Sequence, residues 1–352
     1  MSKFETIAKV TPGFGYSVNC QAELFIGMTP DELGYFCEWT YNPENSPFRK
    51  AEYLLYPLTP VKKIYYLDRL LHKAISKLLG YEIKNIPFPY LSKFSKEGKD
   101  VFSPDFQIPS IIKEGKTIPC TNFINLSPTE RDYQVYKRTI NSIKENYNLV
   151  ISFFGELDGI AHWSGVDSIE YRRKVEELDR WVWDLKSRFV SEYKNGVVIV
   201  VSDHGMVGVK EGKRIDLEII FGTPNDKTYF YFLEGTILRL WTFNSNIKQQ
   251  IEDYLFDLKY GSIIFPEERK KYGISSRKFG DIIFLADESV MFTPCFWGRK
   301  ISKGMHGYHP ELESQKGIFL CSDISVFKEY IHFSSKTISA KNISQVVKRY
   351  LL

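Results

Sequence analysis

The chain has 352 residues, 43% of them hydrophobic and 26% charged, which is enough to bury one large or two modest cores and excludes disorder as the default state. Its 47 basic and 43 acidic residues are interleaved, so the net charge of +4 forms no basic face or tail for a nucleic-acid polymer or an anionic membrane. A small substrate is expected instead.

The start of the chain and its cysteines bear on the cellular compartment. The segment MSKFETIAKVTPGFGYS lacks the basic start and apolar stretch of a secretory signal, and no run reaches the roughly 18 apolar residues of a spanning helix. The five cysteines are scattered without a C-x-x-C pair, which argues against a disulfide framework or a thiolate zinc site. We expect a cytoplasmic protein with reduced thiols, and the sequence indicates no oligomeric state.

In the first half of the chain, the spacing of apolar residues predicts three helices and a strand. A short helix is expected over residues 18–27, a second from Ile64 to Leu78, and a third over 128–146. The third leads into the apolar run 149–154, which is typical of a strand buried on both faces.

A long helix over 168–193 and an apolar strand over 197–201 follow. Strand, helix and strand in succession, each strand wholly apolar, predict parallel pairing through right-handed crossovers. The predicted fold class is therefore α/β, with a mostly parallel sheet flanked by helices.

The pattern changes between residues 226 and 300, where strand-like segments surround one helix. We interpret 226–300 as a small α+β insertion and assign 1–225 together with 301–352 to one catalytic core. A last helix over 340–352 is expected to pack on the main sheet.

Three of the six histidines lie in short motifs, two of which also contain an aspartate. Asp158-Gly-Ile-Ala-His162 follows one buried strand, Asp203-His204 follows the next, and His306 stands between Met and Gly later in the chain. Because ligands gather at the carboxyl ends of the strands in α/β sheets, we expect these side chains to lie together. An aspartate four residues before a histidine is common by chance, but the conjunction of motifs favours a metal site. Imidazole and carboxylate together suit zinc or a similar borderline ion.

A hydroxyl group that could act as a nucleophile precedes the first predicted helix. Ser17 would lie at the N-terminus of that helix, where backbone N–H groups and the helix dipole favour a phosphate group.

These motifs resemble the nucleotide pyrophosphatase/phosphodiesterase branch of the alkaline phosphatase superfamily, over most of the chain. The resemblance rests on Ser-Asp-His-Gly-Met at 202–206, Gly-Met-His-Gly-Tyr-His-Pro at 304–310, the Asp-x-x-x-His motif at 158–162, and Leu-Phe-Ile-Gly-Met-Thr-Pro at 24–30.

The resemblance implies a site with two divalent metal ions, zinc by expectation and manganese as the alternative. It implies metal-dependent hydrolysis of a phosphodiester or pyrophosphate bond in a small phosphate ester, through a phospho-serine on Ser17. The first ion would be bound by Asp203, His204 and Ser17, and the second by Asp158, His162 and His306.

The chain also departs from the pattern of the family. Many relatives have threonine where Ser17 stands, and nucleotide-cleaving members have asparagine where this chain has Cys20. The first strand of the family ends in an aspartate that binds the first ion, and this strand is expected to be absent, with Glu5 as the sole nearby upstream carboxylate. Either the sequence is shortened, or the protein is a catalytically impaired pseudoenzyme or binding module of the same fold.

Two other branches of the superfamily fit less well. A sulfatase needs Cys or Ser followed by x-Pro-x-Arg, which the residues after Ser17 do not supply. A cofactor-independent phosphoglycerate mutase carries a much longer inserted domain than this chain has.

Side chains near the motifs are candidates for substrate contact, although most aromatic residues in a protein are core residues. Glu156 and His309 are candidate partners of the metal ligands or a general acid, with exposed polar residues as the plainer interpretation. The aromatic candidates are Phe36, Trp39, Tyr41, Trp163, Trp297 and Tyr308.

Overall fold

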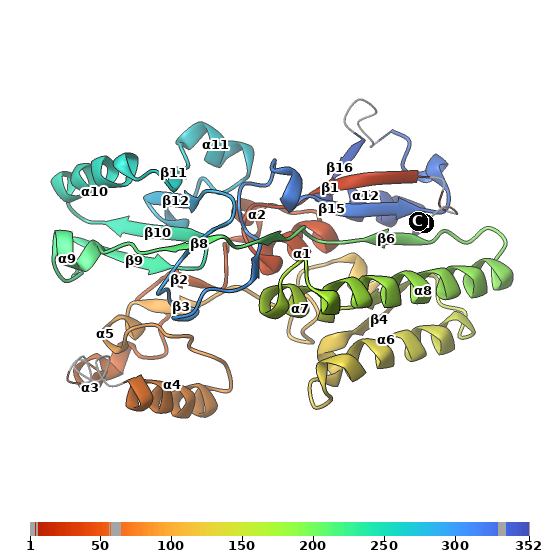
Figure 1. Ribbon diagram of the computed structural model, residues 1–352, viewed down its shortest axis with the longest axis horizontal. Helices are drawn as coiled ribbons and strands as arrows, with labels where there is room; N and C mark the ends of the chain where they lie inside the picture. Colours follow the sequence, from red (N-terminus) through yellow and green to blue (C-terminus); the bar gives the residue numbers. More distant parts are fainter. Residues whose placement is uncertain (1–3, 5, 56, 58–64, 330–335, 352) are drawn as a thin grey trace. The chain divides into compact units, whose positions relative to one another are not determined.

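The computed structural model describes residues 4, 6–55, 57, 65–329 and 336–351 (Figure 1). The chain divides into two compact units, each assembled from separate stretches of sequence. The first unit contains Met1–Thr29, Lys99–Gly208 and Ser302–Leu352, and the second contains Pro30–Gly98 and Val209–Ile301. The core and insertion boundaries inferred from the sequence remain a prediction about folding domains.

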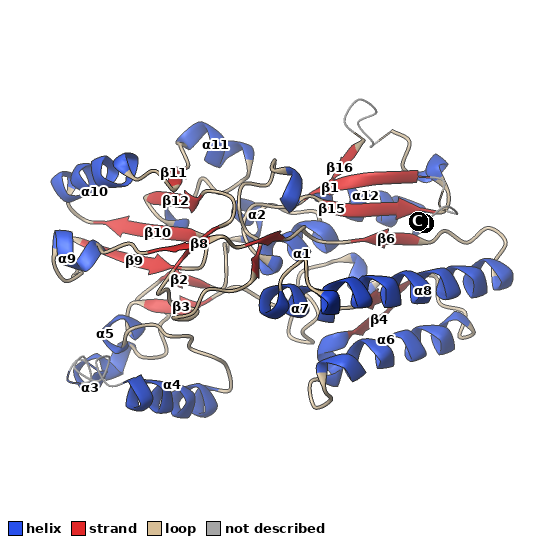
Figure 2. Cartoon of the chain, viewed as in Figure 1, coloured by secondary structure: helices blue, strands red, loops and turns tan. Residues whose placement is uncertain are grey.

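The first unit mixes strands and helices (Figure 2). Its strands are β1 (Thr6–Thr11), β4 (Lys116–Pro119), β5 (Val150–Phe153), β6 (Ile199–Val201), β7 (Val207–Gly208), β14 (Gly304–Met305), β15 (Gly317–Cys321) and β16 (Thr337–Ser339). Its helices are α1 (Ser17–Ile26), α6 (Pro128–Ile143), α7 (Glu156–Ser164), α8 (Ile169–Glu192) and α12 (Ala340–Leu351), with 3-10 turns at Ile111–Lys113, Cys120–Phe123, Glu313–Gln315 and Ile324–Val326.

The predicted α/β class is confirmed, but the described strands do not form one central, mostly parallel sheet. They form a four-stranded sheet in the order β16-β1-β15-β6 and a separate parallel pair, β4-β5. Strand β15, which we did not predict, is antiparallel to both β1 and β6. Because β15 lies between them, β1 and β6 run in the same direction without pairing.

Local sequence explains where the long helices begin. The Ser127 hydroxyl and the Glu130 carboxylate form a capping box at the start of α6, and Pro128 occupies the first turn. At α8, the Ser168 hydroxyl accepts a hydrogen bond from the Tyr171 N–H at 3.1 Å. These two helices pack against each other, and β5 and α7 lie between them in the sequence.

The C-terminal end of α1 is fixed by Gly27, which adopts a left-handed conformation with φ of 80°. A Cβ atom at this position would lie 2.5 Å from the Ser344 hydroxyl oxygen of α12. Glycine therefore allows both the end of α1 and the close packing of α12 upon it.

Strands β5 and β6 are apolar except for Ser152 on β5, and yet their side chains are only partly buried. Among the described strands, β5 pairs with β4 alone and β6 with β15 alone. Each strand therefore has one edge without a strand partner in the part of the chain that the structure describes.

The second unit is built on an antiparallel sheet in the order β11-β12-β10-β9. Its strands are β2 (Trp39–Tyr41), β3 (Phe94–Lys96), β8 (Glu211–Lys213), β9 (Tyr229–Leu233), β10 (Ile237–Thr242), β11 (Gly261–Ile263), β12 (Ile282–Ala286) and β13 (Val290–Phe292). Its helices are α2 (Pro30–Leu33), α3 (Glu52–Leu55), α4 (Tyr65–Leu79), α5 (Phe88–Leu91), α9 (Leu217–Phe221), α10 (Ser245–Asp257) and α11 (Pro266–Lys271), with 3-10 turns at Arg49–Ala51 and Arg277–Phe279. The predicted helix from Ile64 corresponds to α4, and Ile64 itself lies outside the described residues.

The core of the second unit holds a buried ion pair. Arg239 on β10 and Glu234 at the β9–β10 turn are fully buried, and their charged groups approach to 3.2 Å. The guanidinium group also donates to the carbonyl oxygens of Phe36 and Trp39, at 3.2 and 2.6 Å. Backbone acceptors thus stabilise Arg239 independently of its partner.

No helix among the described residues combines the length and the apolar character needed to cross a bilayer.

Candidate metal centre

Four segments of the first unit bring the predicted site residues together. Asp158 and His162 lie on α7, directly after β5, whereas Asp203 and His204 follow β6. Strand β14 pairs with β7, which holds His306 next to the segment that follows β6. Ser17 is the first residue of α1.

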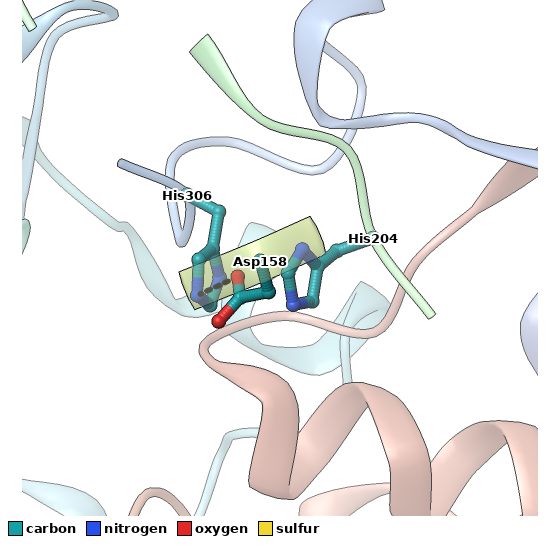
Figure 3. Close-up of side chains that lie close together, drawn as sticks. All are labelled: Asp158, His204 and His306. Atoms are coloured by element: carbon teal, nitrogen blue, oxygen red, sulfur yellow. Dashed lines mark ion pairs between the residues drawn. The ribbon is translucent and has the colours of Figure 1, made fainter. Parts of the chain in front are cut away.

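Asp158, His204 and His306 form the centre of the group (Figure 3). One ligand atom from each residue lies within 4.8 Å of the others. The two imidazole rings stack face to face, with centroids 3.7 Å apart and planes 8° apart. Figure 3 shows the Asp158 carboxylate beside these facing rings.

His162 joins the group through Asp158. Its Nε2 lies 3.5 Å from Asp158 Oδ1, and its Nδ1 lies 2.8 Å from the Gly304 carbonyl oxygen. A carbonyl oxygen only accepts, so Nδ1 carries the hydrogen and donates it, which leaves the lone pair on Nε2. The Nε2 atom of His162 can therefore act as a ligand.

His204 shows the same arrangement on the other side of the group. Its Nδ1 donates to the Gly205 carbonyl oxygen at 2.8 Å, so the lone pair lies on Nε2, 3.0 Å from Ser17 Oγ. Asp203 Oδ2 lies 3.7 Å from the same Nε2 and accepts a hydrogen bond from the Gln21 side chain at 3.1 Å. The first two turns of α1 thus contact both residues of the Asp-His pair, through Ser17 and Gln21.

His306 is the most buried of the three histidines. Burial, together with the neighbouring imidazoles of His204 and His162, lowers the pKa of His306 well below its usual range, so this ring is neutral at pH 7. Its Nδ1 atom is buried without a hydrogen-bond partner. Asp158 Oδ1 is likewise buried without one, although the Asp158 side chain as a whole is 42% exposed.

The donor set fits a divalent cation. The Nε2 lone pairs of His162 and His204 are acceptors, and Asp158 Oδ1, a buried acceptor without a hydrogen-bond partner, lies 3.5 Å from the Nε2 atom of His162. His306 adds a neutral imidazole whose buried Nδ1 atom also has no partner. Neutral imidazole and carboxylate are the ligands that zinc prefers. All the residues of this donor set belong to the first unit.

The contacts among these residues do not separate into the two ligand sets inferred from the sequence. Asp158 contacts His162 and also lies 3.8 Å from His306 Nε2, and Ser17 and Asp203 contact His204. His204, however, also belongs with Asp158 and His306. All six predicted residues therefore lie in one connected cluster, with His204 joining the two sets.

Other residues that the sequence analysis named have different surroundings. The Cys20 thiol donates to the Gly13 carbonyl oxygen at 3.4 Å, and burial, with Asp203 nearby, raises the thiol pKa. Glu156 is buried in ionic contact with Lys174 at 2.6 Å, contrary to the plainer interpretation of an exposed polar residue. His309 Nδ1 accepts the Glu311 N–H at 3.3 Å. Glu5 lies outside the described residues.

The aromatic candidates divide by exposure. Phe36, Trp39 and Tyr308 are core residues with at most 2% exposure, whereas Trp163, next to His162 on α7, is 84% exposed. Tyr16, which precedes Ser17, packs edge-on against the His306 ring at a centroid distance of 5.8 Å.

Sequence reasoning missed three polar residues around the site, which are Gln21, Lys174 and Asp132. Gln21 lies four residues after Ser17, and this helical spacing was a signal that it shares the Ser17 face. Lys174 and Asp132 surround the start of α7, but nothing in the sequence distinguishes them from exposed charges of amphipathic helices.

The sequence profile of the type I phosphodiesterase / nucleotide pyrophosphatase family matches residues 121–309. This span includes all five aspartates and histidines of the cluster and begins after Ser17. None of the curated proteins matches the sequence of the chain significantly.

The chain also resembles several solved structures. Phosphonoacetate hydrolase from Sinorhizobium meliloti 1021, in complex with phosphonoacetate, gives a TM-score of 0.53 at 12% identity, covering 90% of this chain and 81% of that chain. Human ectonucleotide pyrophosphatase/phosphodiesterase 5 gives 0.48 at 16% identity, covering 64% of this chain and 59% of that chain. The murine protein gives 0.47 at 17% identity, with the same coverage.

The likeness to the hydrolase concerns the fold alone, and the chain spans 59% of the length of the human protein. The profile match, in contrast, covers more than half of this chain and the motifs that form the cluster. The chain belongs to the type I phosphodiesterase/nucleotide pyrophosphatase family of the alkaline phosphatase superfamily.

Proposed function

We propose that this protein hydrolyses a phosphodiester or pyrophosphate bond in a metal-dependent reaction, with Ser17 as the nucleophile. The observation that carries the proposal is the position of Ser17 Oγ, 3.0 Å from His204 Nε2 and thus at the edge of the Asp158–His204–His306 group. A hydroxyl group beside a set of metal ligands is an arrangement that supports metal-assisted covalent phosphoryl transfer.

The proposed reaction has two chemical steps, and Ser17 takes part in both. Ser17 Oγ forms a bond to phosphorus while the bond from phosphorus to the leaving oxygen breaks, and the hydroxyl proton passes to water. Ser17 is the first residue of α1, and the positive end of the helix dipole there favours a phosphate group. Within the first turn, the N–H groups of Asn19 and Cys20 already donate to the Tyr16 carbonyl oxygen. A second water then cleaves the phospho-serine, and two inversions give overall retention at phosphorus.

We assign Asp203, His204 and Ser17 to one divalent ion, and Asp158, His162 and His306 to a second. When bound, such ions would lower the pKa of the serine hydroxyl and neutralise charge on the phosphoryl and leaving oxygens. Zinc is the ion that this donor set favours, with manganese as the alternative. His306 supports the assignment because its neutral state requires no deprotonation before a metal binds.

Substitution of Ser17 tests the proposal. The protein is loaded with zinc or manganese and assayed with bis(p-nitrophenyl) phosphate, nucleotide diesters and nucleotide pyrophosphates. Ser17→Ala should lower turnover by about a thousandfold or more, because no hydroxyl remains to form the phospho-enzyme. Ser17→Thr, which retains the hydroxyl, should keep measurable turnover.

A measurement of metal binding distinguishes the loss of the nucleophile from damage to the metal site. Ser17→Ala should bind zinc within about tenfold of the unaltered protein, because five aspartate and histidine ligands remain. Turnover that survives in Ser17→Ala would exclude Ser17 as the nucleophile. Zinc binding by the unaltered protein without hydrolysis of any ester would support a non-catalytic binding role instead.

A further inference from the structure

Away from the metal ligands, the first unit buries a second group of charges. Lys174 on α8, Asp132 on α6 and Glu156 at the start of α7 have side chains that are 4%, 0% and 4% exposed. Lys174 Nζ lies 2.6 Å from Glu156 Oε2 and 3.3 Å from Asp132 Oδ2. Three elements that are separate in the sequence therefore meet at one ammonium group.

Burying this group of charges costs free energy, which suggests that the group has a role other than stabilising the fold. Removing an ammonium and two carboxylates from water carries a large desolvation penalty, and apolar side chains of similar volume often stabilise a fold at least as well. Lys174 is also the single fully buried residue among the described side chains of α8. The lysine lies 4.8 Å from the Trp181 ring, which adds a cation–π contact.

The buried charges act on the backbone at the start of α7. Asp132 accepts hydrogen bonds from the N–H groups of Gly155 and Glu156, at 3.0 and 3.3 Å. These are donors that a helix leaves unsatisfied at its N-terminus. Glu156, the first residue of α7, is held in turn by Lys174, and no side chain of α7 itself caps the helix.

We propose that Lys174 is a positioning residue for the candidate metal centre. Through Glu156 and Asp132, it fixes the first turn of α7, which carries Asp158 two residues after Glu156 and His162 one turn later. The inference rests on the proposed function in that it concerns the ligands of the same metal centre.

The physical reason lies in the charges that remain when the ammonium is lost. Asp132 and Glu156 would then face each other as two buried like charges beside the first turn of a nine-residue helix. The turn would relieve this repulsion by moving, and it carries Asp158 with it. A movement of about 1 Å is enough to disturb a metal site.

The experiment compares Lys174→Met with Glu177→Gln. Glu177 contacts the same ammonium at 2.9 Å, but it lies on α8 and is 38% exposed, so its loss leaves the start of α7 untouched. Zinc affinity is measured by calorimetry, and the imidazole resonances of His162 and His72 are recorded by NMR in the metal-free protein. His72 serves as a reference because it belongs to the second unit.

Lys174→Met should weaken zinc binding about 10- to 100-fold and shift the His162 resonances, with His72 unchanged. Glu177→Gln should stay within about twofold of the unaltered protein. Lys174→Met combined with Glu156→Gln should recover part of the affinity, because Asp132 is then the one charged carboxylate of the pair and no longer faces a second buried negative charge. If Lys174 contributed only to the stability of the fold, Lys174→Met would lower the thermal stability and the added Glu156→Gln would not restore zinc affinity. That result would overturn the inference.

A softer variant keeps the inference testable if Lys174→Met does not fold. Glu156→Gln retains Lys174 and Asp132 but loosens the link to α7, and it should shift His162 and weaken zinc binding about threefold or more. Unchanged His162 resonances and zinc affinity in a folded variant would overturn the inference while leaving the proposed function intact. An unaltered protein that binds neither zinc nor manganese, but whose His162 resonances respond to Lys174→Met alone, would contradict the proposed function and support the positioning role.

Discussion

His162 and His204 each donate a hydrogen from Nδ1 to a backbone carbonyl oxygen, at Gly304 and Gly205. This second contact fixes the tautomer of each ring and turns Nε2 toward the cluster. The aspartates and histidines of the cluster could be predicted from sequence because they lie in recognisable motifs. Two of these motifs directly follow apolar strands, β5 and β6. The tautomers could not, because they depend on where the Gly304 carbonyl of β14 and the Gly205 carbonyl of the loop after β6 lie, and no sequence pattern indicates this.

Glu234 in the second unit leads to a prediction about pH. Burial raises the pKa of this carboxyl group to about 7, although Arg239 acts in the opposite direction. Between the pKa of an unfolded glutamate and pH 7, the folded state therefore holds a proton that the unfolded state has released. As far as this group is concerned, stability is then greatest below the pKa of the unfolded group, at about pH 4 and under, and it falls as the pH rises to about 7, by on the order of 3 kcal/mol.

Urea unfolding between pH 5 and pH 8 measures this effect. Glu234→Gln cannot ionise, so the difference in unfolding free energy between variant and unaltered protein should change with pH in the direction that favours the variant at pH 8. The Arg239 guanidinium keeps its two backbone acceptors in the variant. A difference that is constant across this pH range would mean that Glu234 does not titrate there.

Helices and strands with strong apolar periodicity were predicted well. The long helix expected over 168–193 is α8 (Ile169–Glu192), and the strands expected over 149–154 and 197–201 are β5 and β6. Strand β15 was missed, although Gly317–Cys321 is a short apolar run, because five residues carry too little pattern to separate a strand from a loop. Its antiparallel direction is set by long-range pairing, which the local sequence does not encode.

The junction between α1 and α12 gives a prediction about a single glycine. Gly27→Ala should destabilise the protein by on the order of 2 kcal/mol, because alanine is strained at positive φ and its Cβ would meet the Ser344 hydroxyl. Thermal or urea unfolding measures this loss.

Two variants separate strain from contact at this junction. Gly34 has a similar positive φ with open space around its Cβ position, so Gly34→Ala reports the backbone strain alone. Adding Ser344→Ala to Gly27→Ala should recover the part that is due to the contact. An effect of Gly27→Ala no larger than that of Gly34→Ala would show that α12 accommodates the methyl group.

At the scale of the whole molecule, all six cluster residues belong to the first of the two compact units. A ligand that binds only the folded state stabilises that state by mass action, by about 2.7 kcal/mol at a hundredfold excess over its dissociation constant. Zinc should therefore protect the first unit directly, and a chelator should reverse the protection.

Limited proteolysis with and without zinc measures this difference. Cleavage within Lys99–Gly208 should slow on addition of zinc more than cleavage within Val209–Ile301. Asp158→Asn, which removes the carboxylate shared by His162 and His306, should abolish the selective protection. Equal protection of both stretches in the unaltered protein would show that zinc does not bind at this cluster alone.

The free edge of β6 has a consequence for the exchange of amide hydrogens with solvent. In the β6–β15 ladder, the Ser202 N–H donates to Ile318 and the Ser322 N–H donates to Val198, so the even-numbered residues of β6 face β15. The Val200 amide should then exchange slowly, and those of Ile199 and Val201, which face the free edge, much faster. Strand β6 would thus show a two-residue alternation in exchange rate that a strand paired on both sides would lack.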